Sequence, residues 1–249
     1  MQKKNIFFRL FEKFENCFMT NHSCICCYKE IPDETIFMLC EKCSSQTEFL
    51  DENLCEKCGD KLNLNEKCVN ECSKYNYAFD LNISHCYYTN SAARIIKNLK
   101  YGKRKYLARY VANILEPSFL KLGEVDIITF VPSSKSRKKE RGFNQAEEIA
   151  KALGEKFDKV VLKLLVKTKD TIHQAGGTQK ERLENLKDSF EFDANFCEEI
   201  KGKNILIIDD VFTTGSTLNE CSKVLKEFKP KKIKTLTFAK TKFNLTANN

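Results

Sequence analysis

The sequence predicts an α/β protein with a largely parallel sheet, preceded by a small cysteine-rich module. Runs of branched aliphatic residues alternate with segments of helical spacing between residues 81 and 238, an order typical of parallel strands connected by helices. Four closely spaced cysteine pairs precede this region. The hydrophobic content of 42% over 249 residues excludes a disordered chain and allows unequal domains. We therefore expect an amphipathic helix over 1–22, the cysteine module over 23–78 and the α/β domain over 79–249.

The first 22 residues predict an amphipathic helix rather than a targeting signal. Charged residues interrupt the apolar core that a signal peptide needs, and no apolar run approaches the roughly 20 residues of a membrane span. We therefore expect a cytoplasmic protein whose 13 cysteines are reduced or bound to metal. One helical face carries Phe7, Phe11, Phe14 and Phe18. Packing of this face on the neighbouring domain is the simpler interpretation, and peripheral contact with the cytoplasmic face of the membrane is the alternative.

The cysteine module has the spacing of paired metal ligands. Two thiolates separated by two residues reach the same tetrahedral ion, and two such pairs supply four ligands. We expect two structural zinc ions, held most simply by Cys24, Cys27, Cys40 and Cys43 and by Cys55, Cys58, Cys68 and Cys72. The spacing leaves a crossed pairing open. A redox function would need a thioredoxin-like pattern of strands and helices beside a pair, and the sequence around these pairs lacks one.

Charge is distributed unevenly between the two halves of the chain. Residues 1–80 hold 10 Lys and Arg against 14 Asp and Glu, a net charge of −4, whereas residues 81–249 hold 32 against 20, a net charge of +12. Zinc fingers that bind DNA are normally basic, so we expect the cysteine module to be a scaffold or to bind a partner. A polyanion should instead meet the α/β domain.

The segment 81–115 has no acidic residue and is the candidate DNA-binding surface. Its cations are Arg94, Lys97, Lys100, Lys103, Arg104, Lys105 and Arg109. Charges of one sign without acidic partners favour an anionic ligand, and the tyrosines among them could stack on bases. A solvated basic face is the simpler alternative.

Further elements follow in order along the α/β domain. Strands are predicted at 81–88, 125–131, 160–166, 205–208 and 233–238, and helices at 91–99, 144–153 and 218–228. A basic loop from Ser133 to Gly142 follows the second strand. Because the carboxyl ends of parallel strands meet in one crevice, this loop should face the one that follows 205–208. The polar segment 168–185 contains paired glycines and is predicted to be a mobile lid.

The most informative stretch runs from Ile205 to Leu218. Its four leading aliphatic residues predict a strand buried on both faces, and Asp209 and Asp210 follow directly. A hydroxyl-rich loop with Gly215 then leads into a helix, whose free N–H groups favour a phosphate. The loop lacks the lysine of nucleoside-triphosphate-binding loops. Two carboxylates would repel a phosphate unless they accept hydrogen bonds from sugar hydroxyls, so the pattern predicts a ribose 5-phosphate site.

This stretch resembles the phosphoribosyl pyrophosphate (PRPP) loop of type I phosphoribosyltransferases, although Phe212 stands where a smaller aliphatic residue is usual. With the cysteine pairs and the motif Arg141-Gly142-Phe143-Asn144-Gln145, nearly the whole chain is similar to the ComF (also GntX-like) family of competence-associated proteins. The resemblance implies a type I phosphoribosyltransferase-like fold, PRPP with Mg²⁺ as a ligand, and handling of imported single-stranded DNA during natural transformation. The chain departs from the family at Ser134 and Lys135, where His and Pro are common. The expected PRPP-binding residues are Asp209, Asp210, Val211, Thr213, Thr214, Gly215, Ser216, Thr217, Arg137, Lys138 and Arg141.

Two functions of different classes fit these features. In the first, the chain is a binding module for PRPP and single-stranded DNA, with other DNA-uptake proteins as further partners. In the second, it is a phosphoribosyltransferase that uses Asp209 and Asp210 in catalysis and transfers phosphoribose to an unknown base or amine. The sequence favours the first, because His173 lacks an evident partner as a general base and the excess of cations is larger than one pyrophosphate requires.

Overall fold

The computed structural model describes residues 23–32, 38–68, 72–101, 104–169 and 188–242. The predicted N-terminal amphipathic helix and the predicted lid with His173 lie outside these residues. Within the described part of the chain, no helix is long and apolar enough to cross a membrane.

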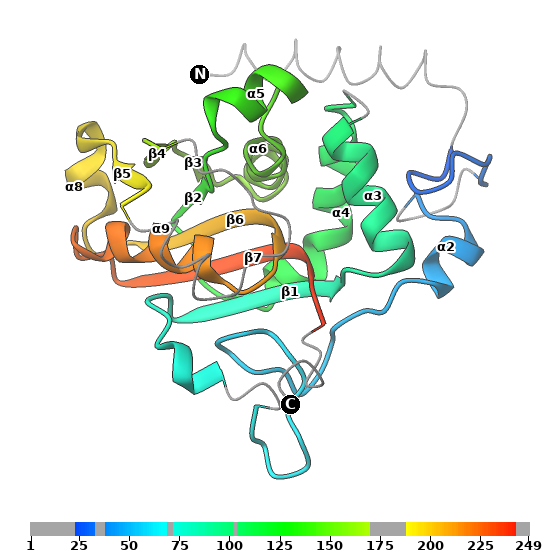
Figure 1. Ribbon diagram of the computed structural model, residues 1–249, viewed down its shortest axis with the longest axis horizontal. Helices are drawn as coiled ribbons and strands as arrows, with labels where there is room; N and C mark the ends of the chain where they lie inside the picture. Colours follow the sequence, from blue (N-terminus) through cyan, green and yellow to red (C-terminus); the bar gives the residue numbers. More distant parts are fainter. Residues whose placement is uncertain (1–22, 33–37, 69–71, 102–103, 170–187, 243–249) are drawn as a thin grey trace.

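A five-stranded parallel sheet forms the centre of the α/β domain (Figure 1). The order across the sheet is β1 (Leu81–Tyr87), β7 (Lys232–Lys240), β6 (Asn204–Phe212), β2 (Ile127–Phe130) and β3 (Val160–Val161). The predicted parallel α/β fold is thereby confirmed. The run Ile205–Ile208 is fully buried because β6 has a neighbouring strand on each side and packed side chains on each face.

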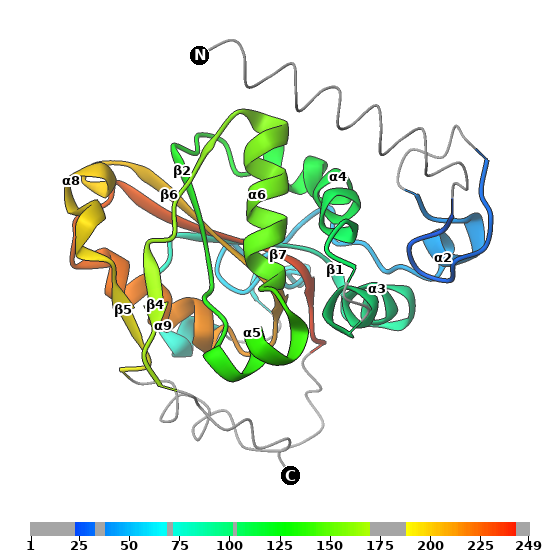
Figure 2. The same cartoon turned by 90° about the horizontal axis from the view of Figure 1, so that it is seen from above.

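Helices and a small antiparallel pair of strands cover the two faces of this sheet (Figures 1 and 2). The helices α3 (Asn90–Tyr101), α4 (Leu107–Leu120) and α6 (Gln145–Phe157) pack with Leu206 and Ile208 in one core cluster. On the other face, Ile205 and Ile207 pack with α9 (Ser216–Lys226), α8 (Cys197–Ile200) and the antiparallel pair β4 (Leu165–Lys167) and β5 (Phe190–Phe192), which a short turn η2 (Ala194–Phe196) follows. Alternate residues of β6 therefore belong to different layers.

Two predicted elements differ in the structure. The apolar run 160–166 contains two short strands that belong to different sheets, β3 and β4. Its residues are apolar because Val161 packs against one core cluster and Leu164 and Leu165 belong to the other, and an apolar run alone does not show where a strand ends.

The predicted basic loop is in large part a helix, α5 (Lys135–Arg141). The Ser134 hydroxyl accepts a hydrogen bond from the Arg137 N–H at 3.4 Å and caps the start of the helix. Gly142, at φ 82°, ends it and donates its N–H to the Lys138 carbonyl at 2.9 Å. Lysine, arginine and glutamate are good helix formers, so the basic composition is compatible with a helix between these caps.

Both segments of the cysteine module contact the sheet domain (Figure 1). The first cysteine segment includes α2 (Glu41–Ser45), and its backbone accepts hydrogen bonds from Asn98 Nδ2 of α3 at the carbonyls of Ile25 (3.0 Å) and Cys26 (3.2 Å). The second segment lies along β1, where Asn82 N–H donates to the Glu56 carbonyl at 2.7 Å. It ends in a 3₁₀ turn, η1 (Cys72–Tyr75).

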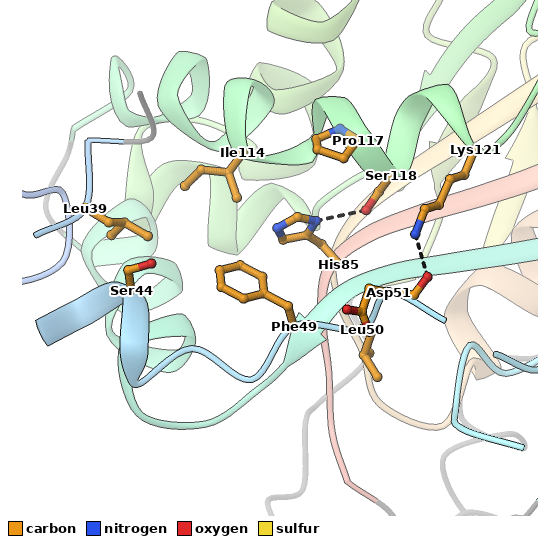
Figure 3. A pocket seen from close by; sticks show the side chains of 10 residues that line it. All are labelled: Leu39, Ser44, Phe49, Leu50, Asp51, His85, Ile114, Pro117, Ser118 and Lys121. Carbon is orange, nitrogen blue, oxygen red and sulfur yellow. Dashed lines mark hydrogen bonds between the residues drawn. The ribbon is translucent and has the colours of Figure 1, made fainter. Parts of the chain in front are cut away.

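An apolar cavity of about 220 Å³ lies between residues 39–51, β1 and α4 (Figure 3). On its walls His85 Nδ1 and Ser118 Oγ share a hydrogen bond of 2.9 Å, and Lys121 Nζ donates to the Asp51 carbonyl at 2.5 Å. Burial, with a smaller contribution from Lys121, lowers the pKa of His85 to about 4, so this imidazole is neutral at physiological pH. None of the residues that the sequence assigns to PRPP, metal or DNA lines this cavity.

Candidate functional site

The two predicted carboxylates lie on the last part of β6, beyond the end of β2. Pairing with β2 stops at Ile208, whereas pairing with β7 continues from Asp209 to Phe212. The strand is therefore longer than the predicted 205–208. Because successive residues of a strand point to opposite faces, Asp210 lies on the side of α3, and its carboxylate forms an ion pair of 2.6 Å with Lys100 Nζ.

Asp209 has a perturbed pKa. Burial and the neighbouring Asp210 carboxylate raise the pKa of Asp209 to about 7, although the Asp210 N–H donates to Asp209 Oδ1 at 2.8 Å. Lys100 and Arg137 act in the opposite direction but do not cancel the effect. A carboxylate whose charge is so poorly compensated is suited to a ligand that brings hydrogen-bond donors to it.

A hydroxyl-rich turn follows β6 and leads into α9. Gly215, at φ 75°, lies immediately before the helix, which begins at Ser216, two residues earlier than predicted. The Thr214 and Ser216 hydroxyls share a hydrogen bond of 2.7 Å. The first N–H groups of a helix have no partners within the helix, and here they stand beside the hydroxyls of the predicted phosphate loop, so both kinds of donor are available to an anion at this turn.

Arg137 of α5 interacts electrostatically with both carboxylates, and Arg141 lies beside it at the end of the same helix. Arg137 is half-buried, and burial followed by repulsion from Arg141 lowers its pKa, which Asp210 and Asp209 partly restore. Arg141 donates from Nη1 to Gln145 Oε1 at 3.3 Å and lies over the Tyr101 ring at 5.4 Å. Among the described residues, Arg141 Nε and Gln145 Nε2 are buried N–H groups without a hydrogen-bond acceptor. An acceptor-bearing ligand would satisfy them.

Lys138, on the same helix, has a carboxylate partner outside the candidate site. Its Nζ is 3.6 Å from a Glu147 carboxylate oxygen, and its side chain is mostly exposed. Lys100, Tyr101 and Gln145 lie at the candidate site, although the sequence did not assign them to the PRPP site. Gln145 belongs to a motif that carried the resemblance, so a signal for it was present. The pairing of Lys100 with Asp210 depends on where α3 ends relative to β6, which the sequence does not show.

The segment 81–115 supplies cations, but several of them have partners. Lys100 pairs with Asp210, and Lys105 Nζ is 3.0 Å from a Glu148 oxygen. Arg104 lies 4.2 Å above the Tyr28 ring of the first cysteine segment. The expectation that these charges lack acidic partners is therefore wrong for Lys100 and Lys105, because their partners come from β6 and α6. Of the other predicted DNA-binding residues, Arg94 and Lys97 are exposed on α3, Arg109 is half-buried and Lys103 lies outside the described residues.

The eight predicted metal ligands form two groups, each with all sulfur atoms within 4.8 Å of one another. The groups are Cys24, Cys27, Cys40 and Cys43, and Cys55, Cys58, Cys68 and Cys72, which is the simple pairing. Tetrahedral ligands with metal–sulfur bonds near 2.3 Å stand about 3.8 Å apart. The Cys27–Cys40 distance is 3.8 Å, and the Cys58–Cys68 and Cys55–Cys72 distances are 3.4 and 3.3 Å. Both groups therefore fit a metal ion such as zinc.

Comparison with known proteins agrees with this arrangement. Residues 139–243, which include the end of α5, the carboxylates and the phosphate loop, match the phosphoribosyl transferase domain family. Competence protein F of Haemophilus influenzae is 31% identical over 198 residues, covering 76% of this chain and 84% of that protein. Competence protein ComFC of Streptococcus pneumoniae is 29% identical over 81% of this chain and 87% of its own length, and the DNA utilization protein YhgH of Escherichia coli K12 is 25% identical over 75% and 83%. With this extent of similarity and both cysteine groups in place, the chain belongs to the ComF family of competence proteins.

Proposed function

We propose that this chain binds PRPP and single-stranded DNA and acts in the cytoplasm in the handling of imported DNA during natural transformation. The observation that supports it most is the meeting of three groups at the carboxyl edge of the sheet. These are the carboxylates of β6, the phosphate loop before α9 and the cations of α3 and α5. The relatives named for competence and DNA utilization support the cellular role.

Each group would contact a different part of PRPP. The carboxylates of Asp209 and Asp210 accept hydrogen bonds from the ribose hydroxyls, and Val211 and residues 213–217 surround the 5-phosphate. Arg137, Arg141 and Lys100 face the pyrophosphate, whose charge Mg²⁺ would share. Lys138 can join them only by leaving Glu147. The unpaired N–H groups of Arg141 and Gln145 would then find acceptors.

Single-stranded DNA would meet the exposed cations of α3. Arg94 and Lys97 are exposed there, and Tyr88 and Tyr106 are exposed at the ends of the same region. A groove that combines cations with aromatic rings binds single strands without reading their sequence. The DNA-binding surface would therefore be separate from the PRPP site, which holds Lys100.

An active phosphoribosyltransferase is the second candidate, because arginines opposite the carboxylates are also what a departing pyrophosphate requires. Release of pyrophosphate from PRPP and Mg²⁺, measured with and without single-stranded DNA and with a panel of bases and amines, separates the two. Binding of PRPP without release under any condition supports the binding module. Release that depends on one acceptor would identify an enzyme.

The cysteine groups would hold two structural zinc ions, since each has four thiols and leaves no position for a water ligand. Elemental analysis of full-length protein purified without chelator should give two zinc ions per chain. A value of one would show that one group does not bind metal, and the absence of zinc would contradict the assignment.

A further inference from the structure

The segment that connects the second cysteine group to β1 also contacts the phosphate loop. Tyr77 is buried, and its hydroxyl donates a hydrogen bond of 2.8 Å to the carbonyl of Thr214. One residue further, the N–H of Ala78 donates to Asn219 Oδ1 of α9 at 2.7 Å. These contacts join residues that are 137 and 141 positions apart in sequence. Two consecutive residues of this connection therefore hold the loop and the first turn of the helix behind it.

An aromatic layer lies directly beneath the loop. The Tyr77 ring stacks on Phe79 with a centroid distance of 4.8 Å and meets the Phe212 ring edge-on at 6.1 Å. A Cβ atom on Gly215 would stand 2.5 Å from Phe212 Cζ and 2.9 Å from Tyr77 Cε1. The loop backbone thus rests on these rings with no room for a side chain, which explains the glycine independently of its positive φ.

The hydrogen bond from Tyr77 also fixes the direction of the neighbouring N–H group. The carbonyl of Thr214 and the N–H of Gly215 belong to one planar trans peptide and point in opposite directions. Because the carbonyl points to Tyr77, the Gly215 N–H points away from the aromatic layer. That side of the loop is where a 5-phosphate would accept hydrogen bonds at the start of α9.

The same aromatic residues pack with the second cysteine group. Cys58 and Cys72 share a core cluster with Tyr77, Phe79 and Phe212. A buried ion pair adds a second connection, because Asp60 of this cysteine segment pairs with Lys240, the residue opposite Phe212 in the β6–β7 register. The second cysteine group and the phosphate loop therefore form one packed unit.

We propose that Tyr77 is a positioning residue for the phosphate loop, through which the second cysteine segment keeps the loop ready to bind the 5-phosphate of its ligand. This inference rests on the proposed PRPP site. The segment between the second cysteine group and β1 would then do more than link the two modules. Its Tyr77 would hold a loop that belongs to the phosphoribosyltransferase-like domain.

The test is to replace Tyr77 with Phe in the full-length protein, which keeps the ring and removes the hydroxyl. Tyr75→Phe is the matched control, because this ring lies 5.9 Å from Tyr77 and its hydroxyl is outside the loop contacts described above. Affinities for PRPP with Mg²⁺ and for ribose 5-phosphate are measured by calorimetry. Tyr77→Phe should weaken both by about five- to tenfold, the usual worth of one hydrogen bond, while Tyr75→Phe matches the wild type.

Measuring both ligands shows which part of PRPP loses affinity in the Tyr77→Phe variant. Ribose 5-phosphate lacks the pyrophosphate, so an equal loss for both ligands places the effect on the ribose 5-phosphate part that they share, and a loss for PRPP alone would overturn the inference. Equal affinities of Tyr77→Phe and wild type would also overturn it, without affecting the proposed function. If wild type binds neither ligand, the proposed function itself fails.

A second variant keeps the test decisive if Tyr77→Phe lowers the melting temperature more than Tyr75→Phe does. Asn219→Ala removes the acceptor of the Ala78 N–H and leaves the aromatic layer intact. It should weaken both ligands in the same proportion. Unchanged affinities in a folded Asn219→Ala protein would contradict the inference in that case.

Discussion

At the scale of single residues, the ion pair between Lys100 and Asp210 determines the charge of the candidate site. The two β6 carboxylates would repel a polyanionic ligand, but Lys100 neutralises Asp210 at 2.6 Å and moderates the raised pKa of Asp209. Because its neighbours in the chain are basic, Lys100 was predicted to be one of the DNA-binding cations. Its acidic partner, Asp210, is 110 positions away in the sequence. The spacing of residues along α3 does not show that the two side chains meet in the fold.

Replacing Lys100 with Ala should weaken binding of PRPP by about tenfold, because the uncompensated carboxylates would then repel its phosphates. Lys97→Ala is the matched control, since Lys97 is exposed on the same helix. Titration of PRPP with Mg²⁺ into both variants provides the measurement. Equal affinities in the two variants would show that Lys100 belongs to the outer surface and not to the site.

At the scale of elements, the sequence predicted whether a segment is a helix or a strand better than it predicted where that element ends. The buried strand Ile205–Ile208 and the helices α3, α6 and α9 were recognisable from their periodicity, because each buries a defined face, whereas α4 and α8 were not predicted. The continuation of β6 through Asp209 was not, since polar residues at a strand end resemble a loop, and only pairing with β7 keeps them in the sheet. The helix α5 was not predicted either. Its sequence has no apolar periodicity, so Ser134 and Gly142 were not recognised as capping residues.

The burial of His85 between β1 and α4 predicts how the stability of the fold depends on pH. The pKa of His85 is about 4 in the folded protein, compared with 6.5 for an ordinary histidine, because burial and Lys121 disfavour the imidazolium ion. Below pH 6.5 the unfolded state binds a proton that the folded state does not, so the free energy of unfolding decreases as the pH falls to 4. The loss from this residue should be about 3 kcal/mol.

Denaturant unfolding of wild type and His85→Gln at a series of pH values measures this contribution. The variant has its own stability at neutral pH, so the comparison concerns the slope between pH 6.5 and pH 4. Wild type should lose about 3 kcal/mol more than the variant over this range. Parallel pH profiles would mean that His85 becomes protonated without cost in the folded state.

At the scale of the whole molecule, the class of fold and both cysteine groups could be predicted, but their relative placement could not. Four-cysteine groups follow from local spacing, whereas their attachment depends on contacts such as Asn98 with the first segment and Asp60 with Lys240. The consequence is that each cysteine segment contacts an element of the site. The first holds α3, which carries Lys100, and the second lies beneath the phosphate loop.

The charge asymmetry of the molecule predicts where DNA binds. Binding of single strands weakens with salt at a slope of about 0.7 per phosphate neutralised. Arg94→Ala/Lys97→Ala should therefore reduce the slope by about 1.4 if both residues contact phosphates. The control is Lys223→Ala/Lys226→Ala, which removes two exposed lysines from α9 on the other face of the sheet.

Fluorescence anisotropy of a labelled single-stranded oligonucleotide at several salt concentrations provides these slopes. A larger effect of the α9 pair would place the DNA on the opposite face. Slopes unchanged in both variants would mean that net charge is a poor guide to this surface, and that DNA contacts other parts of the chain.

The central claim is that the carboxyl edge of the sheet binds a ribose phosphate through the acids of β6, and a calorimetric titration with PRPP and Mg²⁺ tests it most directly. The double variant Asp209→Asn/Asp210→Asn keeps the shape of both side chains and removes their charges. Asp158→Asn is the control, because this exposed aspartate has the left-handed backbone (φ 50°) that asparagine also tolerates. We expect affinity to fall by about two to four powers of ten in the double variant and to stay unchanged in the control. Wild-type affinity in a folded double variant would contradict the assignment of the ribose to these residues.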